Sequence, residues 1–245
     1  MYGTPDQHPS VAVIRLNRPD VRNALRFEDI QALRTHFKHG QLDDAIRVVV
    51  ITGTDGNFCS GADLGEMLQR REAGSSVGPI MREWAGLLTE FLASPKPVVV
   101  AVDGPCAGGG IQLAICSDVC LISTRGYLLN SPGLKIGMPS SELGTLILPA
   151  VIGWKRAKAM SLLSSKITAS EAVDLGLCHE VFGVQEFDDR VMAVAEVLAE
   201  RDPFAIAATK QALNQAVAWG PSLLNLTTLG AIRQVDERGV SWRTH

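Results

Sequence analysis

Two glycine-containing segments carry residue types that could do chemistry with their backbone alone. Each joins an apolar stretch to a helical pattern: Phe58-Cys-Ser-Gly-Ala-Asp-Leu64 and Gly104-Pro-Cys-Ala-Gly-Gly-Gly-Ile-Gln112. The first N–H groups of a helix lack intrahelical partners, the helix dipole adds positive charge there, and small side chains let a ligand oxygen approach. One such turn could bind a phosphate. Two turns aimed at one point would suit an oxygen that gains negative charge during a reaction, which is an oxyanion hole.

The elements that must position these turns alternate between strands and helices. Apolar runs at 11–16, 47–51, 98–102 and 119–122 are typical of strands, and helical spacing is found over 27–37, 80–92 and 109–116. From Glu142 onward almost everything has helical spacing, as over 186–200 and 204–217. We therefore predict stacked β/α turns around one core, followed by a helical segment.

Composition limits the classes of protein to which the chain can belong. A net charge of −3 and a pI of about 6.0 exclude the positive field that attracts nucleic acid. No apolar run reaches the roughly 18 residues of a membrane span, and the first ten residues lack the apolar stretch of a secretory signal. The five cysteines lie largely in apolar segments, and no set of residues completes a metal site. We expect a cytoplasmic protein without nucleic-acid, membrane or metal partners.

Several motifs in order make the chain similar to the crotonase (enoyl-CoA hydratase/isomerase) superfamily. They are Leu16-Asn-Arg-Pro19 with Asn23-Ala-Leu25, Ser60-Gly-Ala-Asp-Leu64, Gly108-Gly-Gly110, Ile152-Gly-Trp-Lys-Arg-Ala157, and Ala169-Ser-Glu-Ala172 with Leu175-Gly-Leu177. The similarity runs from about residue 11 to about 215. It implies an α/β fold of the ClpP/crotonase type, with a β/α superhelical core over 1–150 that holds an acyl-CoA pocket and a helical trimerisation region over 151–245. It also implies homotrimers or homohexamers.

The resemblance assigns roles to particular backbone groups. The N–H groups of Ala62 and Gly109 are expected to bind a thioester oxygen and stabilise the enolate. The backbone around 22–24 and 60–64 is expected to cradle the adenine and pantetheine of a bent coenzyme A, which is the substrate's own carrier and not a separate cofactor. The expected substrate-binding residues are Arg22, Ala24, Ser60, Ala62, Asp63, Leu64, Gly108, Gly109 and Gly133. Arg22 lies near a phosphate in this scheme, or is simply a solvated loop charge.

The chain departs from the family where a hydratase has two glutamates, since Gln112 and Gly133 stand at those places. An amide has no proton-transfer pKa near neutrality and glycine has no side chain, so hydration by paired carboxylates is doubtful. Gln112 could instead orient a water or a substrate carbonyl, or be a satisfied helix side chain. Some isomerases carry a single carboxylate farther along the loop, where Ser141 aligns and Glu142 follows. Glu142 is then a candidate base, or it complements a helix dipole.

Asp63 could act as an acid or base beside the first turn, but its position before Leu64-Gly-Glu-Met67 favours helix capping.

These observations lead to two hypotheses of different class for the function of the chain. The first is an enzyme of the hydratase/isomerase type in which double-bond isomerisation is favoured over hydration, with Glu142 as proton carrier. The second is a non-catalytic acyl-CoA or acyl-carrier binding protein that has lost both glutamates. Decarboxylation or hydrolysis of an unusual thioester is a third hypothesis, because the same turns stabilise any oxyanion.

Overall fold

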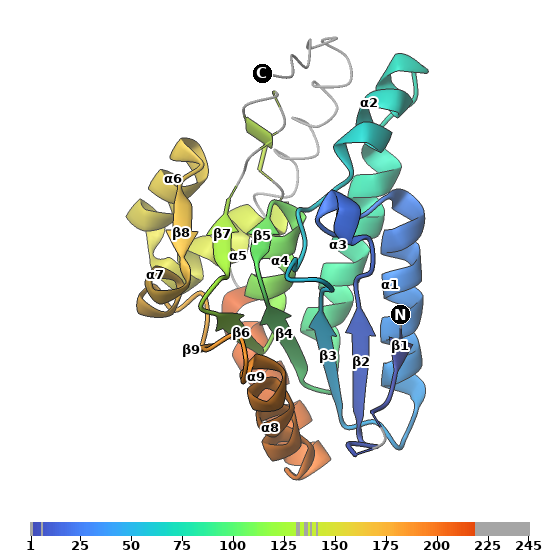
Figure 1. Ribbon diagram of the computed structural model, residues 1–245, viewed down its shortest axis with the longest axis vertical. Coiled ribbons are helices and arrows are strands. Elements are labelled where there is room, and N and C mark those ends of the chain that lie inside the picture. Colours follow the sequence, from blue (N-terminus) through green and yellow to red (C-terminus); the bar gives the residue numbers. More distant parts are fainter. Residues whose placement is uncertain are drawn as a thin grey trace.

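The computed structural model describes residues 2–5, 7–130, 133–134, 137, 139–140 and 142–218. A six-stranded sheet lies at the centre of the fold (Figure 1), with strands in the order β1-β2-β3-β4-β6-β9. Neighbouring strands are parallel except for the edge strand β1, which is antiparallel to β2. The strands are β1 (Tyr2–Gly3), β2 (Val11–Arg15), β3 (Val48–Thr52), β4 (Val98–Val102), β6 (Val119–Ser123) and β9 (Glu180–Phe182).

Both faces of this sheet are covered by helices. Side chains alternate along each strand, so Ile14, Ile51 and Val100 join one buried cluster while their neighbours join another. The first cluster includes side chains of α1 (Phe27–Leu42), α3 (Gly78–Ala93) and α4 (Gly109–Cys116), and the second includes side chains of α8 (Phe187–Ala199). Burial on both faces explains why these strands are almost continuously apolar in sequence.

A smaller sheet extends the fold beyond the end of β4. Its order is β5-β7-β8, with β7 parallel to β5 and antiparallel to β8. These strands are β5 (Pro105–Ala107), β7 (Tyr127–Leu129) and β8 (Lys166–Thr168). The other helices are η1 (Pro19–Val21), α2 (Leu64–Glu72), α5 (Glu142–Ile152), α6 (Trp154–Leu163), α7 (Ala169–Asp174) and α9 (Pro203–Ala218).

The predicted elements of the first half are confirmed, each strand and helix to within a few residues. The expectation of helix alone after Glu142 is wrong at two places, because β8 and β9 are short strands within that region. β9 completes the main sheet beside β6, and β8 completes the small sheet beside β7. Each has three residues, which is too short to show a strand period in the sequence.

Lys210 fixes α9 to the core. Its side chain is 8% exposed, and its ammonium group donates to the carboxylate of Asp118 at 2.6 Å and to the carbonyl oxygens of Phe91 and Lys96 at 2.9 and 3.2 Å. Asn214, one turn later, donates to the carbonyl of Leu92. The three donors of Lys210 are therefore all used inside the protein, which stabilises a buried charge.

No helix within the described ranges is long and apolar enough to cross a membrane.

Candidate functional site

The segments that follow β2, β3 and β4 lie together because the carboxyl ends of parallel strands meet at one edge of a sheet. The first predicted turn comes after β3 and the second after β4. Short bridges then join the three segments side by side. Leu25 pairs with Ala62, and Cys59 pairs with Cys106, both in parallel register.

Four backbone hydrogen bonds hold these bridges. The N–H of Leu25 donates to Gly61 at 2.8 Å, and the N–H of Asp63 donates back to Leu25 at 2.9 Å. On the other side, the N–H of Cys59 donates to Pro105 at 3.0 Å, and that of Ala107 donates to Cys59 at 2.8 Å. The first turn is thus fixed between the segments on its two sides.

The N–H groups of Ala62 and Gly109 take no part in these hydrogen bonds. In a parallel bridge the residue opposite Leu25 directs its own N–H away from Leu25, so the Ala62 N–H faces the segment that leads to Gly109. Neither N–H has an acceptor in the part of the chain that the structure describes. The two turns are adjacent, since a Cβ atom on Gly61 would lie 2.8 Å from the nitrogen of Gly109. An oxyanion hole here remains a prediction, and this geometry is compatible with it.

Gly61 is required by this contact for two reasons. Its φ of +92° is a conformation that side chains rarely adopt, and an added Cβ would also meet the carbonyl of Ala107 at 3.0 Å. The close approach of the two turns therefore depends on a residue without a side chain.

A tryptophan packs against the second turn. A Cβ on Gly109 would lie 2.6 Å from Cζ2 of Trp84, so the indole of α3 fills the space beside the start of α4. The indole N–H donates to Oε1 of Gln112 at 2.6 Å. This bond supports the interpretation of Gln112 as a side chain satisfied within the fold. The side chain is only half-buried, however, so it could also orient a water or a substrate carbonyl.

The predicted coenzyme A segments are also brought together. The carbonyl of Arg22 accepts from the N–H of Ser60 at 3.0 Å, while Ala24 is buried and its carbonyl accepts from Nη1 of Arg18 at 2.8 Å. Arg22 itself is exposed and left-handed, with a φ of 53°. The backbone of 22–24 and that of 60–62 thus run side by side.

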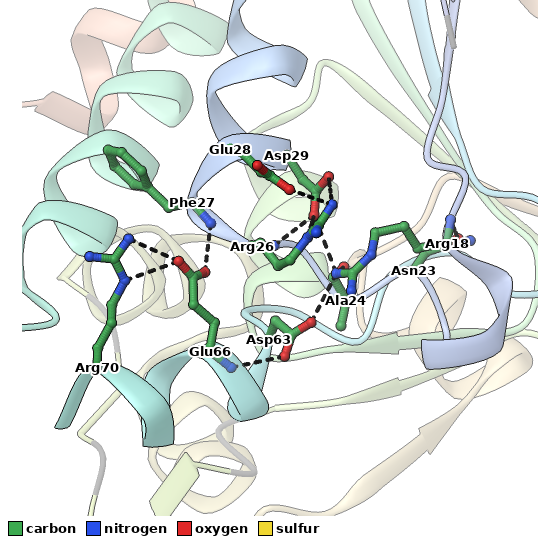
Figure 2. Close-up of polar contacts among 10 residues, drawn as sticks. All are labelled: Arg18, Asn23, Ala24, Arg26, Phe27, Glu28, Asp29, Asp63, Glu66 and Arg70. Atoms are coloured by element: carbon green, nitrogen blue, oxygen red, sulfur yellow. Dashed lines mark hydrogen bonds and ion pairs between the residues drawn. The ribbon is translucent and has the colours of Figure 1, made fainter. Parts of the chain in front are cut away.

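Asp63 caps α2, as the sequence predicted. Its carboxylate accepts from the N–H of Glu66 at 3.2 Å and from Nη1 of Arg18 at 2.9 Å. Figure 2 shows Arg18 reaching between Ala24, Asp29 and Asp63. Burial alone would raise the pKa of Asp63, but these hydrogen bonds and the charge of Arg18 outweigh it and lower the pKa. Asp63 is therefore an ionised structural group rather than a proton carrier.

A cavity of about 450 Å³ opens beside this network. Charged side chains dominate its lining, and Glu66 accepts there from Arg70 at 3.0 Å and from the N–H of Phe27 at 2.7 Å (Figure 2). The cationic groups of Arg18, Arg26 and Arg70 are all paired with carboxylates. The cavity is thus polar and close to electrically balanced.

The remaining predicted site residues lie at the starts of helices or in the loop before α5. Leu64 begins α2 and is 51% exposed, Gly108 precedes the first residue of α4, and Gly133 is half-buried. Glu142 is the first residue of α5, but its side chain, like the whole of Ser141, lies outside the described residues. The role of Glu142 as base therefore stays a prediction.

Arg18 and Trp84 contact the site although the sequence alone assigns them no role. Arg18 belongs to the Leu16-Asn-Arg-Pro19 motif, so its place in that motif was an available signal. Trp84 falls at a position of helical apolar spacing, which is typical of an ordinary core residue, and its contact with Gln112 spans 28 positions. No local pattern indicates that contact.

Comparison with known proteins identifies the family of the chain. The sequence profile of the enoyl-CoA hydratase/isomerase family matches residues 6–226. The 2,3-dehydroadipyl-CoA hydratase of Escherichia coli K12 is 32% identical over 206 residues, covering 84% of this chain and 79% of that protein. The 1,2-epoxyphenylacetyl-CoA isomerase of the same organism is 31% identical over 208 residues, with the same coverage of 84% and 79%.

Solved structures show the same fold. An enoyl-CoA hydratase from Bacillus anthracis superposes with a TM-score of 0.82 at 26% identity, covering 98% of this chain and 90% of that one. A sequence match over most of the chain and a structural match over nearly all of it lead to one conclusion. The chain belongs to the enoyl-CoA hydratase/isomerase family and has the crotonase fold.

Proposed function

We propose that this chain binds an acyl-CoA thioester and stabilises its enolate with the N–H groups of Ala62 and Gly109. The observation that carries the proposal is the contact between the two turns, which leaves both N–H groups without acceptors among the described residues. Each donor of such a pair contributes roughly 3 to 4 kcal/mol to the transition state. The reaction needs no cofactor, because coenzyme A is part of the substrate.

Double-bond isomerisation is favoured over hydration. The carboxylate of Glu142 takes a proton from C2 of a 3-enoyl-CoA, and the electron pair of that C–H bond moves into the thioester. The resulting dienolate carries its negative charge on the oxygen between the two turns. Return of the proton at C4 gives the conjugated 2-enoyl-CoA. Gln112 cannot replace Glu142 as the base, since an amide does not accept a proton near neutral pH.

The coenzyme A part is proposed to lie along the neighbouring segments. The backbone of Arg22, Ala24 and Ser60 would contact the adenine and pantetheine, with Asp63, Leu64, Gly108 and Gly133 completing the binding surface. Support comes from the direct hydrogen bond between the backbones of Arg22 and Ser60. Arg22 is exposed and available to a phosphate.

The alternative is a non-catalytic binder of acyl-CoA or of an acyl carrier. It is favoured by the hydrogen bond from Trp84 to Gln112, which occupies the carbonyl of a side chain that stands where the family resemblance places a carboxylate. In this case the pocket would hold a thioester without moving protons.

Purified protein incubated with 3-hexenoyl-CoA distinguishes the two. The enzyme hypothesis requires growing absorbance of the conjugated 2-enoyl thioester, with loss of about two orders of magnitude or more in Glu142→Gln. Glu200→Gln, a change at an exposed glutamate on the surface, is the matched control and should leave the rate unchanged. Binding of the ester without conjugation would favour the binder, and no binding at all would reject both.

The proposal includes assembly as a homotrimer or homohexamer. Large apolar side chains are exposed on α6, where Trp154, Leu162 and Leu163 are 64%, 69% and 73% exposed. Surfaces of this kind mark contacts between proteins. Light scattering coupled to size exclusion would test the number of subunits, and a monomer at micromolar concentration would reject this part of the proposal.

A further inference from the structure

Trp84 fixes the direction in which the amide of Gln112 faces. The indole is 5% exposed and its N–H lies 2.6 Å from Oε1 of Gln112. An indole N–H only donates, so the atom that faces it must be the carbonyl oxygen of the amide. Of the two possible orientations of the amide, the one with Oε1 toward Trp84 is therefore the one that makes a hydrogen bond.

The other end of the amide is then a pair of N–H donors. Nε2 of Gln112 has no acceptor among the residues with described side chains, and the side chain is half-buried rather than enclosed. A donor in such a place can be satisfied by water or by a ligand.

The position of Gln112 directs this donor toward the candidate site. Gln112 lies three residues after Gly109 on α4, so the two residues share one face of the helix. The indole of Trp84 packs beside Gly109 and also donates to Gln112, so the amide lies close to the start of α4, in the direction toward which helical side chains lean. A ligand whose thioester oxygen lies at that N–H would have its next acyl carbons beside the amide.

We propose that Trp84 makes Gln112 an obligate hydrogen-bond donor, and that the site therefore prefers acyl-CoA thioesters with an acceptor oxygen on C3, such as 3-oxoacyl-CoA, over plain hydrocarbon chains. A methylene at C3 would displace water from the N–H groups and leave them unpaired, whereas a carbonyl would accept from them. The inference rests on the binding part of the proposed function and not on the migration of a double bond.

The test compares two esters of equal chain length, 3-oxobutanoyl-CoA and butanoyl-CoA, by isothermal titration calorimetry. We expect the wild type to bind the 3-oxo ester about tenfold more tightly. The preference should fall to about one in Gln112→Leu, which has no donor. It should fall below one in Gln112→Glu, since the indole N–H would hold one oxygen and leave the other as an acceptor facing the substrate.

Trp84→Phe keeps an aromatic ring but removes the indole N–H, so the amide can turn its oxygen toward the ligand and the preference should weaken. Phe204→Leu changes an exposed aromatic residue on α9 and is the control, with the wild-type ratio expected. The ratio of two dissociation constants is measured, so a loss of affinity common to both esters does not affect the result. Circular dichroism verifies the fold of each variant.

Equal affinity of the wild type for the two esters would overturn the inference while leaving the proposed function intact. An unchanged ratio in both Gln112 variants would do the same. If neither ester binds to the wild type, the proposed function fails, and the inference fails with it.

Discussion

Nη1 of Arg18 lies 2.9 Å from Oδ2 of Asp63, and this ion pair joins the loop after β2 to the start of α2. The same Nη1 lies 3.2 Å from Asp29 on α1 and donates to the carbonyl of Ala24. One guanidinium group thereby connects three elements around the first predicted turn. Ala62 immediately precedes Asp63, so this connection lies next to the Ala62 N–H.

Acid should destabilise the protein partly through this network. Burial raises the pKa of Asp63 and of Asp29, but hydrogen bonds to arginine and to backbone N–H groups lower both values overall, below the unfolded value of 3.8. A group with a depressed folded-state pKa contributes stability above its unfolded pKa, and this is lost as the pH falls through the folded value. We expect Asp63→Asn, which can still cap α2, to lose about 1 kcal/mol at pH 6 and less at pH 3, which lies below the unfolded pKa.

Urea denaturation at both pH values measures this difference. Asp44→Asn, at an exposed position outside the network, is the control. Equal losses at the two pH values would show that the ionised carboxylate of Asp63 does not stabilise the fold.

Gly109 and Trp84 should show strong coupling in a double-mutant cycle. Gly109→Ala places a methyl group 2.6 Å from the indole, an overpacking that costs about 1 to 3 kcal/mol. Trp84→Leu removes the indole and costs roughly 3 kcal/mol through the cavity it leaves. The double variant should be at least about 1 kcal/mol more stable than the sum of the single effects predicts. Additive free energies of unfolding in urea would contradict the contact.

Asn23 should be replaceable by glycine more easily than by alanine. It is fully buried with a φ of 52°, donates to the carbonyl of Asn57 at 2.6 Å and accepts from the N–H of Arg18 at 2.7 Å. Both substitutions lose these hydrogen bonds, at about 1 kcal/mol each, but only alanine adds left-handed strain of roughly 1 kcal/mol. Thermal unfolding should therefore rank the wild type above Asn23→Gly and Asn23→Gly above Asn23→Ala. The reverse order for the two variants would show that strain is not decisive.

Lys210→Met should be the most damaging change in the C-terminal region. It removes a buried cation and leaves the partly exposed Asp118 carboxylate without its partner, which costs about 3 kcal/mol. Lys155→Met, at an exposed lysine on α6, is the matched control and should alter stability by less than about 0.5 kcal/mol. Chemical denaturation of both variants measures the difference. Similar stabilities would mean that the ion pair contributes nothing net.

Most of the fold could be predicted because its strands are buried on both faces and its long helices have clear apolar spacing. The strands β8 and β9 could not, since Lys166–Thr168 and Glu180–Phe182 are too short to show a period and exist only through pairing with β7 and β6. The same division applies to the site. Glycines in sequence mark the two turns, whereas the contact of Trp84 with Gln112 depends on how α3 packs on α4.

All five thiols of the chain are buried and none is in a disulfide. Burial raises the pKa of Cys59 and of Cys116 to about 12, so almost none of either thiol is ionised at neutral pH. A thiol reagent can then react only when the surrounding structure opens, and its rate reports how often that happens. Cys59 and Cys106 would register opening where the two turns meet, and Cys116 would register opening at the end of α4. The protein thus carries natural probes from which the opening free energy of the site can be read separately from that of the whole chain.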